Sequence, residues 1–136
     1  MSETNILRLP SSPTSVCQLE DFLKDIIMEH RVCESKFSDM LVSLTEAVNN
    51  AIIHGNQNDE KKNVMVKCKT TNKGIHFSIV DQGKGFNIES IPDPTSAEKI
   101  ETCGGRGVFI MNALADKVAI KNNGNTNTVK IYFSAK

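Results

Sequence analysis

Tryptophan is absent from this 136-residue chain, tyrosine occurs once, and aromatic residues make up 5% of the total. An excess of charge of one sign is absent too, because 16 lysines and arginines balance 16 aspartates and glutamates. A neutral chain has no global positive field, so we expect no nucleic acid and no membrane as partners. No apolar run approaches the roughly 18 residues of a membrane span, and no charged-then-apolar leader opens the chain.

Cysteines are few and scattered, at Cys17, Cys33, Cys68 and Cys103. They form no CxxC pair and have no histidine at metal-ligand spacing, which excludes a disulfide scaffold and a structural zinc site. We therefore expect reduced, mostly buried thiols and a cytoplasmic protein. Hydrophobic residues reach 39%, and neither a repeat nor a long Ser/Gly/Pro linker divides the chain. We expect one domain over residues 1–136.

Hydrophobic periodicity and turn residues predict the order strand, two helices, two strands, long loop, helix, two strands. Ser12 before Pro13 is typical of a helix start, and Gly55 is typical of a helix end. The predicted bounds are Asn5–Leu9, Pro13–His30, Ser35–Gly55, Val64–Thr70, Ile75–Asp81, Val108–Ala115, Lys117–Lys121 and Thr128–Phe133. Helices on one face of a mostly antiparallel, mixed sheet make an α+β fold, a two-layer α/β sandwich.

The second predicted helix carries three polar residues at i, i+4 spacing, Glu46, Asn50 and His54. An amide oxygen is a hard ligand suited to Mg²⁺, and a carboxylate can accept a proton from an attacking hydroxyl. The alternative is the ordinary polar back of an amphipathic helix. Val42 and Ile53 share the polar face, which indicates that something covers it. The core stripe on the opposite side is predicted to be Leu41, Leu44, Val48, Ala51 and Ile52.

Two glycine-rich segments follow. In Asp81–Phe86 (DQGKGF), a carboxylate at a strand end could accept a hydrogen bond from an exocyclic amine, and glycines let the backbone lie against a planar ring. The alternative is a strand-ending turn. Gly104–Gly107 (GGRG) precedes a helix, where backbone amides favour an anion such as phosphate, and the alternative is a linker. The 17 residues 87–103 between them are long for a structureless connection and predict a lid, in which Thr95–Glu98 fits a capping box.

In this order and spacing, ExxxNxxxHG (residues 46–55), DxGxGF (81–86) and GRG (105–107) resemble the N box and the two glycine boxes of the GHKL ATPases, the superfamily of gyrase and histidine kinases. The phrases LTEAVNNAIIHGN, IPDPT and GRGVFIMNALADKV are similar to the small anti-sigma factor kinases of bacteria. The resemblance covers nearly the whole chain. It implies the Bergerat fold, ATP and Mg²⁺, with a lid over about residues 87–107.

The resemblance also implies roles for individual residues. Glu46 would be the general base, Asn50 would hold Mg²⁺, and Asp81 would bind the adenine amino group. Thr128 takes the place of a threonine that supports adenine through water. The implied nucleotide-binding set is Asn50, His54, Asp81, Gly83, Gly85, Phe86, Thr95, Gly104, Gly105, Arg106, Gly107, Val108 and Thr128.

Proteins of this type phosphorylate a serine or threonine of a small anti-sigma factor antagonist, sequester a sigma factor and commonly act as homodimers. The resemblance therefore implies a serine/threonine-protein kinase whose partners are an antagonist protein and a sigma factor or similar regulator. His30 lacks the flanking residues of a histidine-kinase phosphoacceptor box, so we do not expect autophosphorylation there. The alternative function is a nucleotide-gated binding module that moves no phosphoryl group and needs Asp81 and Asn50 but not Glu46.

Overall fold

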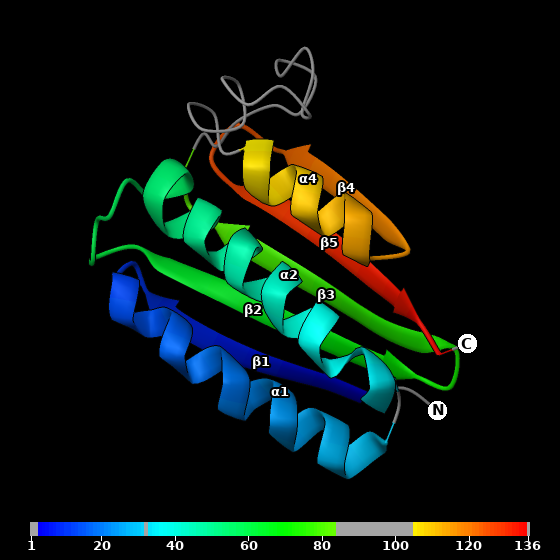
Figure 1. Ribbon diagram of the computed structural model, residues 1–136. Helices are drawn as coiled ribbons and strands as arrows, with labels where there is room; N and C mark the ends of the chain where they lie inside the picture. Colours follow the sequence, from blue (N-terminus) through cyan, green and yellow to red (C-terminus); the bar gives the residue numbers. More distant parts are fainter. Residues whose placement is uncertain (1–2, 32, 84–104, 136) are drawn as a thin grey trace.

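The computed structural model describes residues 3–31, 33–83 and 105–135. Within these residues, the helices α1, α2 and α4 lie side by side on one face of a five-stranded sheet (Figure 1). The arrangement confirms the predicted α+β two-layer sandwich and the predicted order of the helices and strands, whereas the predicted long loop lies outside the described residues. No helix among the described residues has the length and apolar character needed to cross a bilayer.

The sheet has the strand order β1-β2-β3-β5-β4, and every pairing among the described strands is antiparallel. The prediction of a mixed sheet is therefore wrong for this part of the chain. The pairs β2–β3 and β4–β5 are hairpins, and the longer connections from β1 to β2 and from β3 to β5 also bring the chain back in the opposite direction. The strand bounds are β1 Glu3–Pro10, β2 Asn63–Thr71, β3 Gly74–Asp81, β4 Lys117–Asn122 and β5 Asn127–Ser134.

Alternation along the strands separates a face covered by helices from an open face. In β2 the buried residues are at every second position, from Val64 to Thr70, and in β5 from Asn127 to Phe133. Phe77 of β3 and Phe133 of β5 meet edge to face in the core, with ring centroids 6.4 Å apart. The helices bury their apolar sides on the same face of the sheet.

The first helix begins where Ser12 and Pro13 predict, but its first turn is a 3-10 turn, η1 (Pro13–Val16), before α1 (Cys17–His30). Ser12 occupies the N-cap position with an extended backbone but makes no side-chain capping hydrogen bond. Arg31 ends α1 in the left-handed conformation (φ 54°), and its N–H donates to the carbonyl of Ile27.

The second predicted helix is present in three parts: η2 (Glu34–Lys36), α2 (Phe37–Asn50) and the π-helical turn η3 (Ala51–Gly55). Of the predicted core stripe, Leu44, Val48, Ala51 and Ile52 are buried, and Leu41 is half-buried. Gly55 does end the helical run, but it lacks the positive φ of a helix-terminating glycine. Gly55 instead allows the helix end to pack closely against Asp81 of β3.

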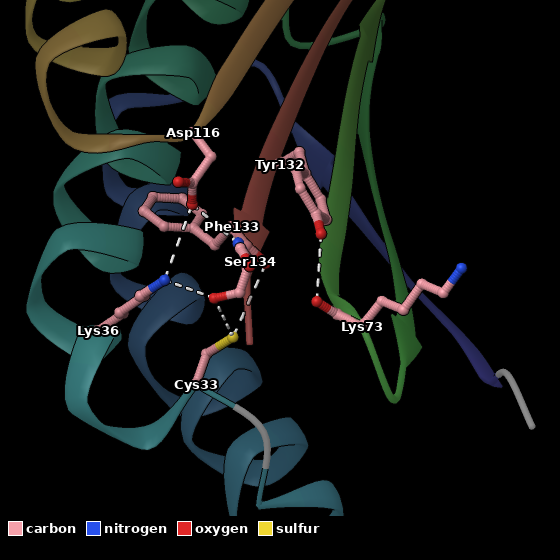
Figure 2. A network of polar contacts seen from close by, with 7 residues as sticks. All are labelled: Cys33, Lys36, Lys73, Asp116, Tyr132, Phe133 and Ser134. Carbon is pink, nitrogen blue, oxygen red and sulfur yellow. Dashed lines mark hydrogen bonds and ion pairs between the residues drawn. The ribbon is translucent and has the colours of Figure 1, made fainter. Parts of the chain in front are cut away.

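A network of polar contacts joins the start of α2 to the end of β5 (Figure 2). The Lys36 ammonium donates to the carbonyl of Ser134 and lies 3.7 Å from the Asp116 carboxylate. That carboxylate accepts the N–H of Ser134 at 2.8 Å. The Cys33 thiol donates to the same Ser134 carbonyl at 3.3 Å. These contacts hold the N-terminal end of α2 against the last strand, close to the carboxyl end of α4 (Gly105–Leu114).

The described cysteines Cys17, Cys33 and Cys68 are unpaired thiols. Cys33 and Cys68 are buried as predicted, whereas Cys17 is exposed. Burial raises the pKa of Cys33 and raises that of Cys68 to about 12, so both remain protonated at neutral pH. Cys103 lies outside the described residues.

Candidate nucleotide site

Asp81 is the centre of the candidate site, at the end of β3 on the helix-covered face of the sheet. Its side chain is buried, with 2% of the residue exposed. One carboxylate oxygen accepts the N–H of Gly83 at 2.9 Å, and the other lies 3.5 Å from the amide nitrogen of Asn127. Burial raises the pKa of the Asp81 carboxyl, and these two hydrogen bonds and the charge of Lys62 oppose the rise. A buried carboxylate with so few donors is suited to accept a hydrogen bond from a ligand.

Asn127 of β5, which the sequence analysis did not name, is the neighbour of Asp81 on the next strand. The amide nitrogen of Asn127 faces the Asp81 carboxylate. Its amide oxygen is buried and has no hydrogen-bond partner among the described residues. The pairing Asp81↔Asn127 puts both side chains on the same face of the sheet. Thr128 pairs with Val80 and therefore points to the open face, away from Asp81. The alternation of buried and open positions along β5 can be read from the sequence. Which of these positions lies beside Asp81 follows only from the pairing of β5 with β3.

Two glycines let the backbone close around Asp81. A Cβ on Gly55 would lie 2.3 Å from the Asp81 carboxyl carbon, and a Cβ on Gly83 would lie 1.6 Å from the carbonyl oxygen of Gly55. Neither position has room for any side chain. The end of the helical run at Gly55 therefore packs directly against Asp81 of β3 and against the next turn at Gly83, although Gly55 and Asp81 are 26 positions apart in the sequence.

A second buried asparagine, Asn56, holds this junction together. Its side-chain oxygen accepts the N–H of Gln82 at 2.7 Å, and its amide nitrogen donates to the Ser11 hydroxyl at 2.9 Å. The side chain of Gln82 in turn accepts the N–H of Asn63 at 3.1 Å. Asn56 is 1% exposed, so it is a positioning residue for the turn after Asp81 and does not line the surface. The sequence analysis did not single it out.

Glu46 and Asn50 lie on α2 under the first turn of α4. A Cβ on Gly107 would lie 2.8 Å from the Asn50 amide nitrogen and 3.1 Å from a Glu46 carboxylate oxygen. The element that covers this part of the polar face is therefore α4, and the two helices approach each other at Gly107. Val42 and Ile53 on the same helix remain 43% and 48% exposed. The carboxylate and amide lie next to each other and next to the N-terminus of a helix, where anions are favoured.

A hollow of about 880 Å³ opens beside Asp81. It is lined by His54 and Gly55 from the helix end, by Gln82 and Gly83 from the turn after β3, and by the turn between β4 and β5. Its size is that of a small-molecule or cofactor site. The predicted residues His54 and Gly83 therefore line one hollow, in contact with the Asp81 junction.

The remaining predicted residues divide into two groups. Gly105, Arg106 and Gly107 form the first turn of α4, which begins three residues before the predicted helix start at Val108, and the side chain of Val108 is fully buried in the core. Gly85, Phe86, Thr95, Gly104 and the rest of the predicted lid up to residue 104 lie outside the described residues.

Comparison with known proteins identifies the family. A family model described as a histidine kinase-like ATPase domain matches residues 9–133. A relative named anti-sigma F factor, from Clostridium perfringens, is 31% identical over 96 residues, which are 68% of this chain and 68% of the relative. Another relative, named serine-protein kinase RsbW, from Oceanobacillus iheyensis, is 26% identical over 123 residues, which are 85% of this chain and 77% of the relative.

Solved structures share the fold at low sequence identity. The RsbU and RsbW domains of a Mycobacterium tuberculosis protein match with a TM-score of 0.71 and 16% identity, over 96% of this chain. The match covers 32% of that longer chain. A chain of the SiaB–SiaC complex from Pseudomonas aeruginosa matches with a TM-score of 0.64 and 10% identity, over 95% of this chain and 88% of that chain.

Proposed function

The chain belongs to the histidine kinase-like ATPase domain family and is of the bacterial anti-sigma factor type, and from this premise we propose that it is an ATP-dependent serine/threonine-protein kinase. Family membership implies ATP binding. The kinase activity, the residues that perform it and the protein substrate are the content of the proposal. The name of the relative serine-protein kinase RsbW supports that activity.

The observation that carries the proposal is the junction at Asp81. The Asp81 carboxyl is buried and its pKa is raised, and the neighbouring Asn127 has a buried amide oxygen without a partner among the described residues. The backbone around Asp81 leaves no room for a Cβ at Gly55 or Gly83. An exocyclic amine such as that of adenine offers two N–H donors, which these two oxygens would accept. Gly55 and Gly83 would hold the Asp81 carboxylate in place for this contact, because their close packing around it leaves no space for a side chain.

The phosphates would lie at the N-terminus of α4, beside Asn50 of α2. Asn50 would offer its amide oxygen to Mg²⁺, which neutralises phosphate charge when bound, and the backbone amides of Gly105–Gly107 would bind phosphate oxygens. Glu46 would accept the proton of a substrate hydroxyl as the hydroxyl oxygen bonds to the γ-phosphorus. The bond from that phosphorus to the bridging oxygen then breaks, and ADP leaves.

The partners of this kinase are proposed from the relatives. The name anti-sigma F factor, borne by a relative, supports a sigma factor or similar regulator as the sequestered protein. The substrate would be a small antagonist protein that carries the acceptor serine or threonine, and the kinase would act as a homodimer. We further propose that residues 1–136 act as one domain with a lid over about residues 87–107.

Transfer of label from γ-labelled ATP tests the proposal. With Mg²⁺ and a soluble extract of the source bacterium, we expect the wild-type chain to label a small protein on serine or threonine. Asp81→Asn at equal concentration is the control. Partner binding that requires ATP but transfers no label would replace the kinase by a nucleotide-gated binding module. A calorimetric titration without heat on addition of Mg²⁺ with ATP or ADP would contradict both functions.

A further inference from the structure

The open face of the sheet carries cations and no carboxylate among its described strand residues. Register and alternation place one basic residue or more from four of the strands on this face. These basic residues, here called the basic face, are Arg8, Lys67, Lys69, Lys117, Lys121 and Lys130. The two acidic residues in the described strands, Glu3 and Asp81, lie on the helix-covered face. Within the described strands, the basic and acidic side chains are therefore separated between the two faces of the sheet.

No member of the basic face forms an ion pair with a described acidic residue. The ion pairs in this part of the chain involve Lys24, His30 and Lys36, all in the helix layer. Lys67 and Lys130 both flank Ser78, so their strands are about 10 Å apart. That separation is close to the screening length at physiological salt, and like charges so arranged repel one another.

The basic face is hollowed. A cavity of about 1060 Å³ lies over the middle of the sheet, lined by Lys67, Lys69 and Lys130 among others. His76 and Tyr132 form part of its wall and stack on each other with ring centroids 4.4 Å apart. The Tyr132 hydroxyl donates to the carbonyl of Lys73 at 3.1 Å (Figure 2), so this aromatic pair is held in place by its own contacts.

Aliphatic side chains adjoin the cations. Ile6 of β1 is 55% exposed on the open face. Met65 and Val80, paired across β2 and β3, are half-buried on the same face, and Met65 is the diagonal neighbour of Ile6. An occupant of this surface would therefore meet positive charge and aliphatic carbon together.

We propose that the basic face binds an acidic polypeptide segment of a partner protein that carries aliphatic side chains among its carboxylates. The proposal goes beyond the kinase function and does not depend on it, because Asp81 and Glu46 lie on the other side of the sheet. Carboxylates would pair with the lysines, and aliphatic side chains would cover the patch at Ile6, Met65 and Val80.

Other occupants fit this surface less well. A second copy stacked face to face would bring two sets of cations together. Single-stranded nucleic acid needs open aromatic platforms, whereas His76 and Tyr132 stack on each other. Five of the six cations are lysines, whereas arginine is the residue suited to bidentate phosphate recognition. A flat bilayer cannot reach the floor of a hollow. A polypeptide offers several carboxylates and aliphatic side chains spaced along one chain, as the lysines and the aliphatic patch are spaced on this face.

Binding of synthetic peptides to the full chain tests the proposal. The probe is a fluorescent peptide of four Asp-Glu-Leu-Ser repeats, and its controls replace the acids by Asn and Gln or the leucine by serine. The double variant Lys67→Gln with Lys130→Gln removes two charges from the basic face. The matched control, Lys24→Gln with Arg31→Gln, removes two exposed charges from the helix layer.

We expect the first double variant to weaken binding of the acidic peptide about tenfold and the matched control to leave it unchanged. Raising the salt concentration should weaken binding, the neutral peptide should not bind, and loss of leucine should reduce affinity. Equal effects of the two double variants would overturn the proposal. So would tighter binding of oligothymidine or phosphatidylserine vesicles than of the peptide, or a change of oligomeric state on neutralising the basic face.

His76 provides a local reporter. Burial and the neighbouring charge of Lys69 lower the pKa of its imidazole. Carboxylates bound over Lys69 would favour the protonated ring, so the His76 pKa measured by NMR should rise when the acidic peptide binds. An unchanged His76 pKa at saturation would place the peptide elsewhere and contradict the proposal.

Discussion

The helix-covered face and the open face of the sheet carry polar residues of different kinds. On the covered face, Asp81, Asn127 and Asn50 are buried and sit against specific neighbours. On the open face, lysines stand exposed in a group without described acidic partners. A buried polar group is costly without a hydrogen-bond partner, so its position is tied to particular neighbours. An exposed charge contributes little free energy alone, so exposed charges contribute to binding as a group. This difference underlies both proposals, phosphotransfer at the covered face and peptide docking on the open face.

The largest effect should follow from Glu46→Ala. Without the proposed base, we expect phosphotransfer to fall roughly 10²–10⁴-fold while ATP affinity is retained. Single-turnover transfer of labelled phosphate and calorimetry measure the two quantities. Asp25→Ala, which removes an exposed acid of α1, serves as the control. Transfer at the wild-type rate in Glu46→Ala would end the assignment of chemistry to this residue.

Asp81→Asn should weaken ATP binding by about 10–100-fold, because a charge-assisted hydrogen bond contributes about 1.5–3 kcal/mol. Calorimetry with Mg²⁺ and ATP measures the change. The same substitution should leave peptide binding on the basic face intact. Unchanged ATP affinity would mean that the adenine site lies elsewhere.

The same variant should make the ligand-free fold more stable at neutral pH. Burial raises the folded-state pKa of Asp81, so its ionised form disfavours folding above that pKa, and the penalty disappears as pH falls below the unfolded value near 3.8. Asparagine has no such penalty, and its amide could donate to the oxygen of Asn127 that lacks a partner. Thermal unfolding should show a gain at pH 7 that vanishes towards about pH 3.5. A gain of equal size at both pH values would refute this explanation.

A smaller effect is expected at the clip between α2 and β5. Asp116→Ala removes the acceptor of the Ser134 N–H and the ionic partner of Lys36 (Figure 2). Because Asp116 is partly exposed, we expect a loss of about 1 kcal/mol of unfolding free energy in urea, with ATP affinity unchanged. The exposed Asp59→Ala, on a surface turn, is the comparison.

The smallest effect is expected from neutralising the basic face in the isolated protein. Lys67→Gln with Lys130→Gln relieves repulsion between exposed like charges, so the free energy of unfolding should rise by a few tenths of a kcal/mol at low salt. The gain should shrink as salt is added. A loss of stability would show that these lysines have partners that stabilise the fold, contrary to the contrast between the two faces.

Spacing along the chain predicted much of the site. The positions of Glu46 and Asn50 on one face of α2, and of Asp81 at a strand end, follow from the periods of helix and strand, whereas His54 lies in the π-helical turn η3. Gly55 was expected to end a helix through its backbone freedom, yet its lack of a side chain matters because Asp81 lies against it. The resemblance implied Thr128, whereas the pairing of β5 with β3 puts Asn127 on the same face of the sheet as Asp81 and Thr128 on the other.

Local periodicity was enough to specify the elements, their order and the residues that face a core, because each depends on neighbours a few positions away. Contacts between distant segments specified the rest: the meeting of Gly55 with Asp81, the cover of α4 over Glu46, and the gathering of lysines from several strands into one surface. Charge balance along the chain hides that surface, since a sum over residues carries no information about which side of a sheet each one occupies.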